Sequence, residues 1–262
     1  MSDVFSFHAG DSPLLISVPH DGCHLPPDIR DRMTPAGLAL PDTDWHVAEL
    51  YSFAREFGAN MLVANYSRYV VDINRSASDD NLYPGQVATG LCPLQTFAGD
   101  DIYTSSQVSK EEVRDRVAVY WQPYHDKIAS VIEATREKYG YALLWDAHSI
   151  PSVVPRLFEG ELPELNIGTN GGSSCAGHIE TGVREAAEAS PYSTVLNGRF
   201  KGGFITRHYG NPDHNIHAVQ LEIAQRVYMD ESTGIFDAAK VFSLRDILRN
   251  MLGAFTGLSK RE

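Results

Sequence analysis

The chain has 262 residues, of which 43% are hydrophobic and 21% charged, and it carries a formal net charge of −12. This composition is typical of a globular protein, and the acidic balance argues against a nucleic-acid or anionic-membrane partner, because both need a basic field. We therefore expect one domain spanning residues 1–262 and a small-molecule partner.

The chain has three widely spaced cysteines and does not begin like a secretion signal, so we expect reduced thiols and a cytoplasmic protein. It has no apolar run of about 20 residues, so we expect no membrane partner. The first half of the chain shows strand-like apolar runs at 14–18, 61–64 and 69–73. Between them, apolar residues at spacings of three and four predict a helix over 45–57. Residues 76–104 are rich in Gly, Pro, Asp and Ser, which predicts a long loop that closes over a substrate as a lid.

The second half begins with a helical pattern over 110–139, where Pro123 predicts a kink or break. An apolar run at 141–145 then leads into Asp146 and His148. Further strands are predicted at 165–167, 194–196 and 217–223, and further helices at 179–189 and 236–258. Strands that alternate with helices predict an α/β fold, with a mixed, largely parallel central sheet covered by helices on both faces.

Two histidines, His20 and His148, each follow an apolar strand-like run. Because α/β sheets bind ligands beyond the carboxyl ends of their strands, both histidines are expected at one pocket, where a metal would suit them. A catalytic zinc takes three protein ligands and keeps one position for water. We favour Asp44 as the third ligand, with His46 and Asp42 as alternatives, although an Asp before a helix is also typical of a simple N-cap.

Glu222 lies within an apolar run, where an ionised carboxylate is costly unless it is paired or functional. As a general base, it would take a proton from water and return it to a leaving nitrogen. The alternatives are that it faces solvent on an edge strand or pairs with a buried arginine. Ser149 adjoins His148 but lies outside a Gly-x-Ser-x-Gly elbow, so a serine nucleophile is disfavoured.

Cations gather at the ends of the predicted segments, although the chain is acidic. They are Arg68, Arg75, Arg199, Lys201 and Arg207. Any one of them could be a surface or structural residue. Several converging on one pocket would select a small anionic substrate, because arginine binds carboxylates in a bidentate fashion.

Six segments in order resemble the N-formylglutamate amidohydrolases, also called N-formylglutamate deformylases. They are VPHDG at 18–22, TDWH at 43–46, NYSRYVVDINR at 65–75, YPGQ at 83–86, WDAHS at 145–149 and NGRFKGGFITRHY at 197–209. The resemblance covers nearly the whole chain. It implies hydrolysis of N-formyl-L-glutamate to formate and L-glutamate, a late step of histidine degradation, and a fold similar to the zinc carboxypeptidases.

The resemblance also implies a zinc ion held by His20, Asp44 and His148. In the carboxypeptidases the acidic ligand follows the first histidine by three residues. That position is Cys23 here, so the carboxylate must come from elsewhere in the chain.

By the same resemblance, Asn74 and Arg75 would bind a substrate carboxylate, and Glu222 would be the general base. A cation, Arg207 or Arg68, would stabilise the oxyanion, and Arg199, Lys201 or Arg207 would bind the second carboxylate. The alternatives are a zinc amidohydrolase or peptidase acting on another N-acyl amino acid, and a non-catalytic binder of small dicarboxylates. The ligand set would also accept manganese or iron.

Overall fold

The computed structural model describes residues 3–80, 89–105 and 108–258. The strands in this part of the chain are β1 (Phe5–His8), β2 (Leu14–Val18), β3 (Asn60–Ala64), β4 (Ala142–Ile150), β5 (Leu165–Gly168), β6 (Thr194–Leu196), β7 (Ile216–Ala224), β8 (Met229–Asp230) and β9 (Ile235–Phe236). β8 and β9 form a separate hairpin.

The main helices are α1 (Pro27–Arg30), α2 (Pro35–Leu38), α3 (Val47–Leu50), α4 (Lys110–Arg116), α5 (Gln122–Tyr139), α6 (Gly177–Glu188), α7 (Phe204–Tyr209) and α8 (Ala238–Leu258). Short 3₁₀ segments are η1 (Tyr51–Phe57), η3 (Pro212–His214) and η4 (Gln225–Val227), and η2 (Val117–Trp121) is a π-helical turn. Among the described residues, no helix has the length and apolar character needed to span a bilayer.

The seven-stranded sheet has the order β1-β3-β2-β4-β7-β5-β6. β2 pairs in parallel with β3 and β4, β4 with β7, and β5 with β6. The pairs β1 with β3 and β5 with β7 are antiparallel. The predicted mixed, largely parallel sheet is therefore confirmed.

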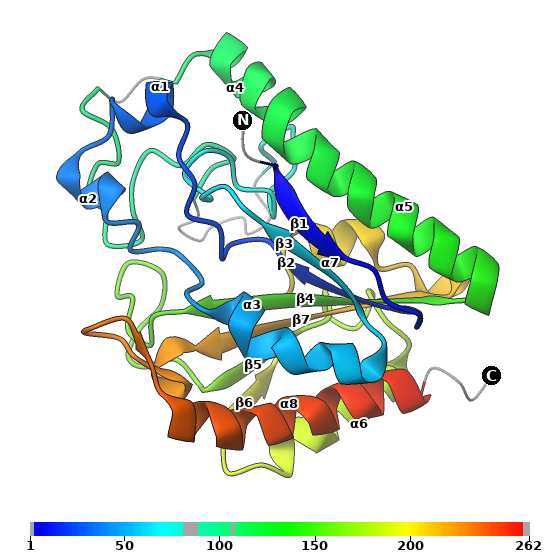
Figure 1. The fold of residues 1–262 in the computed structure, drawn as a ribbon. Helices are drawn as coiled ribbons and strands as arrows, with labels where there is room; N and C mark the ends of the chain where they lie inside the picture. Colours follow the sequence, from blue (N-terminus) through cyan, green and yellow to red (C-terminus); the bar gives the residue numbers. More distant parts are fainter. Residues whose placement is uncertain (1–2, 81–88, 106–107, 259–262) are drawn as a thin grey trace.

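Helices cover both faces of the sheet, as predicted (Figure 1). On one face, Ile16, Trp145 and Val219 belong to a core that includes Ile179 of α6 and Leu248 of α8. This is the face that carries the red α8 helix and α6 in Figure 1, opposite the long green helix α5.

On the other face, Leu144 and Ala218 pack with Ile128 of α5 and Ile205 of α7. Alternate residues of a strand point to the same face, so the side chains of Asp146 and His148 share the face of Leu144. The register places Asp146 opposite Gln220 and His148 opposite Glu222 on the neighbouring strand. A row of polar side chains thus follows the apolar core toward the carboxyl ends of β4 and β7.

The strand predicted over residues 69–73 is wrong, because this segment forms turns beyond the sheet. Its carbonyl groups accept hydrogen bonds from side chains, not from a neighbouring strand. Arg116 Nη1 donates to Val70 O at 2.9 Å, and Asp72 N donates to Leu91 O at 2.7 Å. The β-forming residues Tyr69 and Val70 are buried in a loop core instead.

The helix predicted over 45–57 begins at Val47 and continues as 3₁₀ helix η1. His46, just before it, has a φ of 65°, so the chain turns sharply between the loop and the helix. The helix predicted over 110–139 is continuous from α4 to α5, with the π-helical turn η2 immediately before Pro123. Proline lacks the N–H of a regular turn, which explains the irregularity at this place.

Residues 76–104 contain no helix or strand in their described parts. Leu91 N donates to Asp79 Oδ1 at 2.6 Å, which ties the two described flanks together. The YPGQ segment and its neighbours, 81–88, lie outside the described residues, so the lid stays a prediction.

Candidate metal centre and active site

The two histidines meet because their strands are neighbours. His20 lies two residues beyond β2, and His148 lies on β4, which pairs in parallel with β2. Their rings are 4.9 Å apart between centroids. Asp44 reaches them from the loop before α3, where its backbone N–H donates to His20 O at 3.1 Å. The predicted convergence of these three residues is confirmed.

One ligand atom from each of His20, Asp44 and His148 lies within 4.8 Å of the others. Asp44 Oδ2 is 3.0 Å from His148 Nδ1 and 3.7 Å from His20 Nδ1. His20 Nδ1 and Asp44 Oδ1 are buried and have no hydrogen-bond partner among the described residues. Buried polar atoms are rarely left unsatisfied, and a divalent cation at this point would satisfy both. Two imidazoles and one carboxylate therefore form a site that could bind a metal.

The structure also separates Asp44 from its alternatives. His46 Nε2 donates to Gly234 O at 2.9 Å, and its ring packs beside Phe236. Asp42 Oδ2 accepts a hydrogen bond from Phe97 N at 2.8 Å. Both side chains thus face partners away from the histidines, which leaves Asp44 as the third member of the group.

Each histidine is held from behind by a second carboxylate. His20 Nε2 donates to Asp72 Oδ1 at 2.8 Å, and His148 Nε2 lies 3.2 Å from Asp146 Oδ2. A carboxylate at the far nitrogen is the usual device that orients a metal-binding imidazole and leaves its other nitrogen available. The role of Asp72 was not predicted from the sequence, although Asp72, like Glu222, is a carboxylate within an apolar run.

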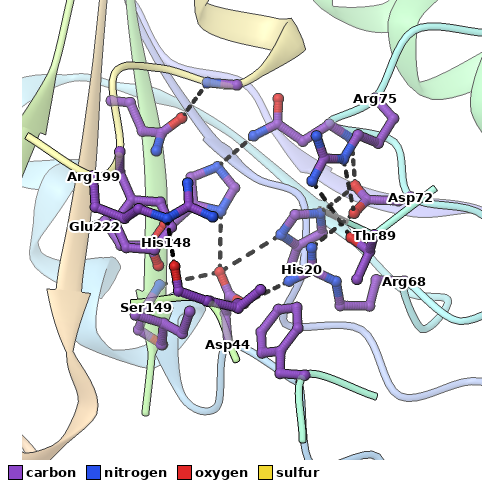
Figure 2. A pocket seen from close by; sticks show the side chains of 17 residues that line it. His20, Asp44, Arg68, Asp72, Arg75, Thr89, His148, Ser149, Arg199 and Glu222 are labelled. Atoms are coloured by element: carbon purple, nitrogen blue, oxygen red, sulfur yellow. Dashed lines mark hydrogen bonds and ion pairs between the residues drawn. The ribbon is translucent and has the colours of Figure 1, made fainter. Parts of the chain in front are cut away.

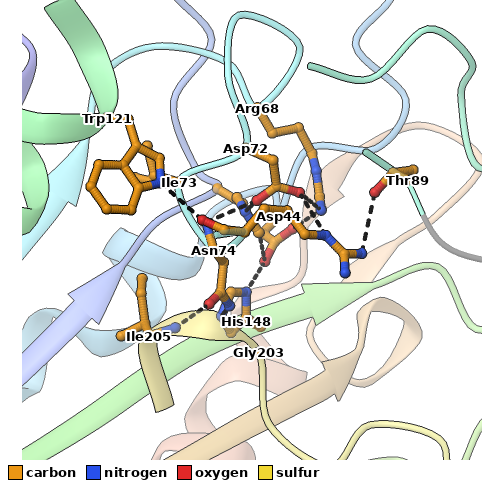
Figure 3. A network of polar contacts seen from close by, with 12 residues as sticks. Asp44, Arg68, Asp72, Ile73, Asn74, Thr89, Trp121, His148, Gly203 and Ile205 are labelled. Atoms are coloured by element: carbon orange, nitrogen blue, oxygen red, sulfur yellow. Dashed lines mark hydrogen bonds and ion pairs between the residues drawn. The ribbon is translucent and has the colours of Figure 1, made fainter. Parts of the chain in front are cut away.

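Asn74 lines the pocket beside His148, and protein partners hold its amide (Figure 3). Its Oδ1 accepts a hydrogen bond from Ile205 N at 2.8 Å, which fixes the orientation of the amide. Its Nδ2 is then 3.2 Å from Asp146 Oδ2 and 2.8 Å from His148 Nε2. The amide predicted to bind substrate thus has protein partners in this structure, and its contact with substrate stays a prediction.

The charges of the group are strongly coupled. Burial opposes ionisation of Asp72, but Arg68 and His20 hold the pKa of its carboxyl well below the usual range. Burial likewise opposes ionisation of Asp44, yet hydrogen bonds from His148 and His20 lower its pKa. Both aspartates are therefore ionised at neutral pH, as metal binding requires.

Glu222 is buried beside His148 on a central strand, between β4 and β5, so it is not on a solvent-facing edge. Burial raises the pKa of its carboxyl to about 8, and Asp44 adds to the effect, whereas His148 and Arg68 oppose it. A carboxyl group with a pKa near neutrality can both accept and release a proton. The position and environment of Glu222 would suit an acid–base role, which stays a prediction here.

The pocket is a cavity of about 80 Å³ (Figure 2). Besides the metal group and Glu222, it is lined by Arg68, Arg75 and Arg199, and by the apolar side chains of Phe97, Ile150, Leu157 and Phe200. Small size, a cationic rim and an apolar wall suit a short anionic molecule.

The three arginines are held differently. Arg68 is buried and donates to Asp72 Oδ2 at 2.7 Å, with its Nη1 3.6 Å from Asp44 Oδ1. Arg75 Nε is 4.0 Å from Asp72 Oδ2. Arg199 Nε donates to Leu157 O at 2.8 Å. Arg68 thus lies beside the metal group, and the other two lie on loops around the cavity.

Two predicted site residues lie apart from the described pocket, and their roles stay predictions. Lys201 and Arg207 are not among the described side chains that line the pocket. Lys201 is exposed, and Arg207, in the last turn of α7, donates from Nε to Gly202 O at 2.7 Å. Arg199, in the segment before α7, lines the cavity, whereas Lys201 of the same segment and Arg207 of α7 do not.

Comparison with known proteins gives a consistent result. The family model for N-formylglutamate amidohydrolase matches residues 12–229. The chain is 49% identical to the N-formylglutamate deformylase of Pseudomonas putida, over 88% of this chain and 87% of that protein. It is 48% identical to the N-formylglutamate deformylase of Pseudomonas aeruginosa PAO1, over 96% of each.

Among solved structures, the fold matches the crystal structure of an N-formylglutamate amidohydrolase from Ralstonia eutropha JMP134. The TM-score is 0.81 at 21% identity, and the match covers 98% of this chain and 97% of the other. At this identity, the likeness speaks for the fold alone.

Proposed function

The chain belongs to the N-formylglutamate amidohydrolase family, and from this membership we propose that it hydrolyses N-formyl-L-glutamate to formate and L-glutamate. The observation that carries the proposal is the meeting, in one small pocket, of a metal-ligand group, a buried carboxyl group and loop arginines. Each part answers one need of the reaction: activation of an amide, transfer of a proton, and recognition of two carboxylates.

The metal would be held by His20, Asp44 and His148. Two imidazole nitrogens and one carboxylate oxygen are a usual ligand set for catalytic zinc, and manganese or iron would also fit. When bound, the ion would polarise the formyl carbonyl and make water more acidic. Asp72 and Asp146 would keep both imidazoles oriented.

Glu222 would move the proton. It takes a proton from the water whose oxygen attacks the formyl carbon, and it then gives that proton to the glutamate nitrogen as the C–N bond breaks. The second proton of the water, released as the hydroxyl of the tetrahedral intermediate becomes formate, goes to the amine, so the products are formate and the ammonium form of glutamate, and atoms and charge balance. Arg68, which lies beside Asp44, would stabilise the negative charge that develops on the carbonyl oxygen.

The two substrate carboxylates would be bound by Arg75 and Arg199, since both line the cavity and lie on loops. Phe97, Leu157 and Phe200 would contact the methylene groups and exclude water from the reacting centre.

Formate release from N-formyl-L-glutamate by metal-stripped and metal-reloaded protein tests the proposal. We expect activity only after reloading. N-formyl-L-glutamine keeps the shape of the substrate but lacks one negative charge, and its kcat/KM should be at least tenfold lower, because roughly one charged hydrogen bond is lost. Equal activity with and without metal, or no formate under any condition, would contradict the proposal.

A further inference from the structure

We propose that Gln225 and Tyr228 are positioning residues that hold Asp44 in place at the metal centre, by binding the backbone on either side of it. The inference rests on the proposed metal site and extends it to residues that follow β7, far from Asp44 in the sequence.

Asp44 poses a structural problem that the histidines do not. His20 and His148 are fixed by neighbouring strands, whereas Asp44 lies on an irregular loop between α2 and α3. A metal ligand must be held within about 0.5 Å of its productive position by the groups around it. Its N–H bond to His20 O and the bond from Ser149 N to its Oδ2, at 3.0 Å, fix only part of this loop.

The carbonyl groups on both sides of Asp44 are bound by buried side chains. Gln225 Nε2 donates to Thr43 O at 3.0 Å. Tyr228 Oη donates to Trp45 O at 2.7 Å. Gln225 and Tyr228 are at most 2% exposed. Because they bind the residues immediately before and after the ligand, they fix the direction in which the Asp44 side chain leaves the loop.

The same two side chains meet at Ser149. Gln225 Nε2 is 3.3 Å and Tyr228 Oη 2.7 Å from Ser149 Oγ. Ser149 follows His148 on β4, and its own N–H binds Asp44. The network therefore ties the Asp44 loop to the strand that carries His148. It also gives the Ser149 hydroxyl a structural use, which argues against the serine as a nucleophile.

Gln225, Tyr228 and Ser149 each have at least two hydrogen-bond partners in this buried network, and such networks restrict the positions of their members. The separation between Asp44 and His148 is then set by groups that touch neither the metal nor the substrate. Loss of one of them should loosen the third ligand and leave the carboxylate-binding arginines unchanged.

The test is Tyr228→Phe, which removes one hydroxyl and little volume. Zinc affinity is measured by competition with a chelator on metal-stripped protein, together with thermal unfolding and KM for N-formyl-L-glutamate at saturating zinc. We expect zinc affinity to fall about 10- to 100-fold, as for other outer-shell partners, with KM unchanged. Gln225→Met, which keeps the volume but loses the amide, should act in the same direction.

Tyr51→Phe is the matched control, because Tyr51 is also fully buried but its hydroxyl accepts from Trp145 Nε1. It should leave zinc affinity unchanged. Folded Tyr228→Phe and Gln225→Met proteins that bind zinc like the wild type would overturn this inference alone. A wild type that binds no zinc, manganese or iron would overturn it together with the proposed function. If one variant does not fold, the other decides.

Discussion

The metal side of the pocket and its carboxylate-binding side differ in how their side chains are held. His20, Asp44 and His148 are at most 3% exposed, and each is bound by at least one other buried group. Arg75, in contrast, is partly exposed, with its Nε 4.0 Å from Asp72 Oδ2 and its Nη2 3.4 Å from Thr89 Oγ1.

The difference follows from the kind of ligand that each side would bind, which is a metal ion on one side and a substrate carboxylate on the other. A metal ion imposes short bonds and fixed angles, so its ligands must be placed before it arrives. A substrate carboxylate brings its own charge and can complete the geometry of an arginine fork on binding. Substitutions on the metal side should therefore change metal affinity or turnover, and those on the carboxylate side should change KM.

Glu222→Gln is expected to give the largest effect, because it keeps the shape of a metal-side group and removes only the proton transfer. Turnover should fall by about 10²- to 10⁴-fold, with metal affinity and KM near those of the wild type. Steady-state formate release and zinc titration measure the three quantities. Glu49→Gln, on the exposed surface, is the control. Near-normal turnover would remove Glu222 from the mechanism.

The second prediction concerns the backbone under the carboxylate side. His125 of α5 donates from Nε2 to Ile73 O at 2.8 Å, and Trp121 Nε1 donates to Arg75 O at 2.9 Å. Burial lowers the pKa of His125 from 6.5 to about 4. The unfolded chain therefore binds this proton more readily than the folded chain does. The resulting stability is fully present above about pH 6.5 and is lost as the pH falls toward 4, about 3 kcal/mol in all.

Denaturant unfolding of metal-free wild type and His125→Gln between pH 4 and 7 measures this contribution. The difference between the two profiles isolates His125 from the other titrating groups. It should be largest at neutral pH and shrink as the pH falls. The exposed His24, changed in the same way, is the control. Profiles that stay parallel for wild type and His125→Gln would contradict the assignment.

The sequence predicted the histidines and Glu222 because their signals are local. Each follows from strand periodicity, from the cost of a charge within an apolar run, or from the rule that strand ends meet at one edge. The choice of Asp44 needed the structure, since Asp42 and His46 lie within two residues of it and only the loop geometry separates them.

The strand prediction failed because contacts with residues distant in the sequence determine the structure of that segment. Residues 69–73 have the β-formers of a strand, but Arg116 binds their carbonyls from α4, and strand propensity contains no information about that contact. The roles predicted for Lys201 and Arg207 stay predictions, and neither side chain lines the described pocket, because the direction of a side chain depends on the backbone around it. The partners of Asn74 likewise come from α7 and β4.

Asp72→Asn tests whether Asp72 belongs to the metal side of the pocket, because its carboxylate binds His20 and also lies near Arg75. Zinc affinity should fall about 10- to 100-fold, since the far nitrogen of His20 loses a charged acceptor. Chelator competition measures it. Asp42→Asn is a matched control, as Asp42 is a buried carboxylate of the neighbouring loop that binds Phe97 N. Unchanged affinity in Asp72→Asn would mean that burial alone orients the imidazole.

Arg75→Lys should give the smallest effect and is the most direct test of the carboxylate side. Lysine keeps the positive charge but loses the fork that binds a carboxylate through two parallel hydrogen bonds. At roughly 1 kcal/mol for one hydrogen bond, KM should rise about three- to tenfold, with turnover and zinc affinity unchanged. Arg55→Lys, on an exposed helix surface, is the control. If zinc affinity falls instead while KM holds, Arg75 acts through Asp72 and belongs to the metal side, and the division of the pocket into two sides fails.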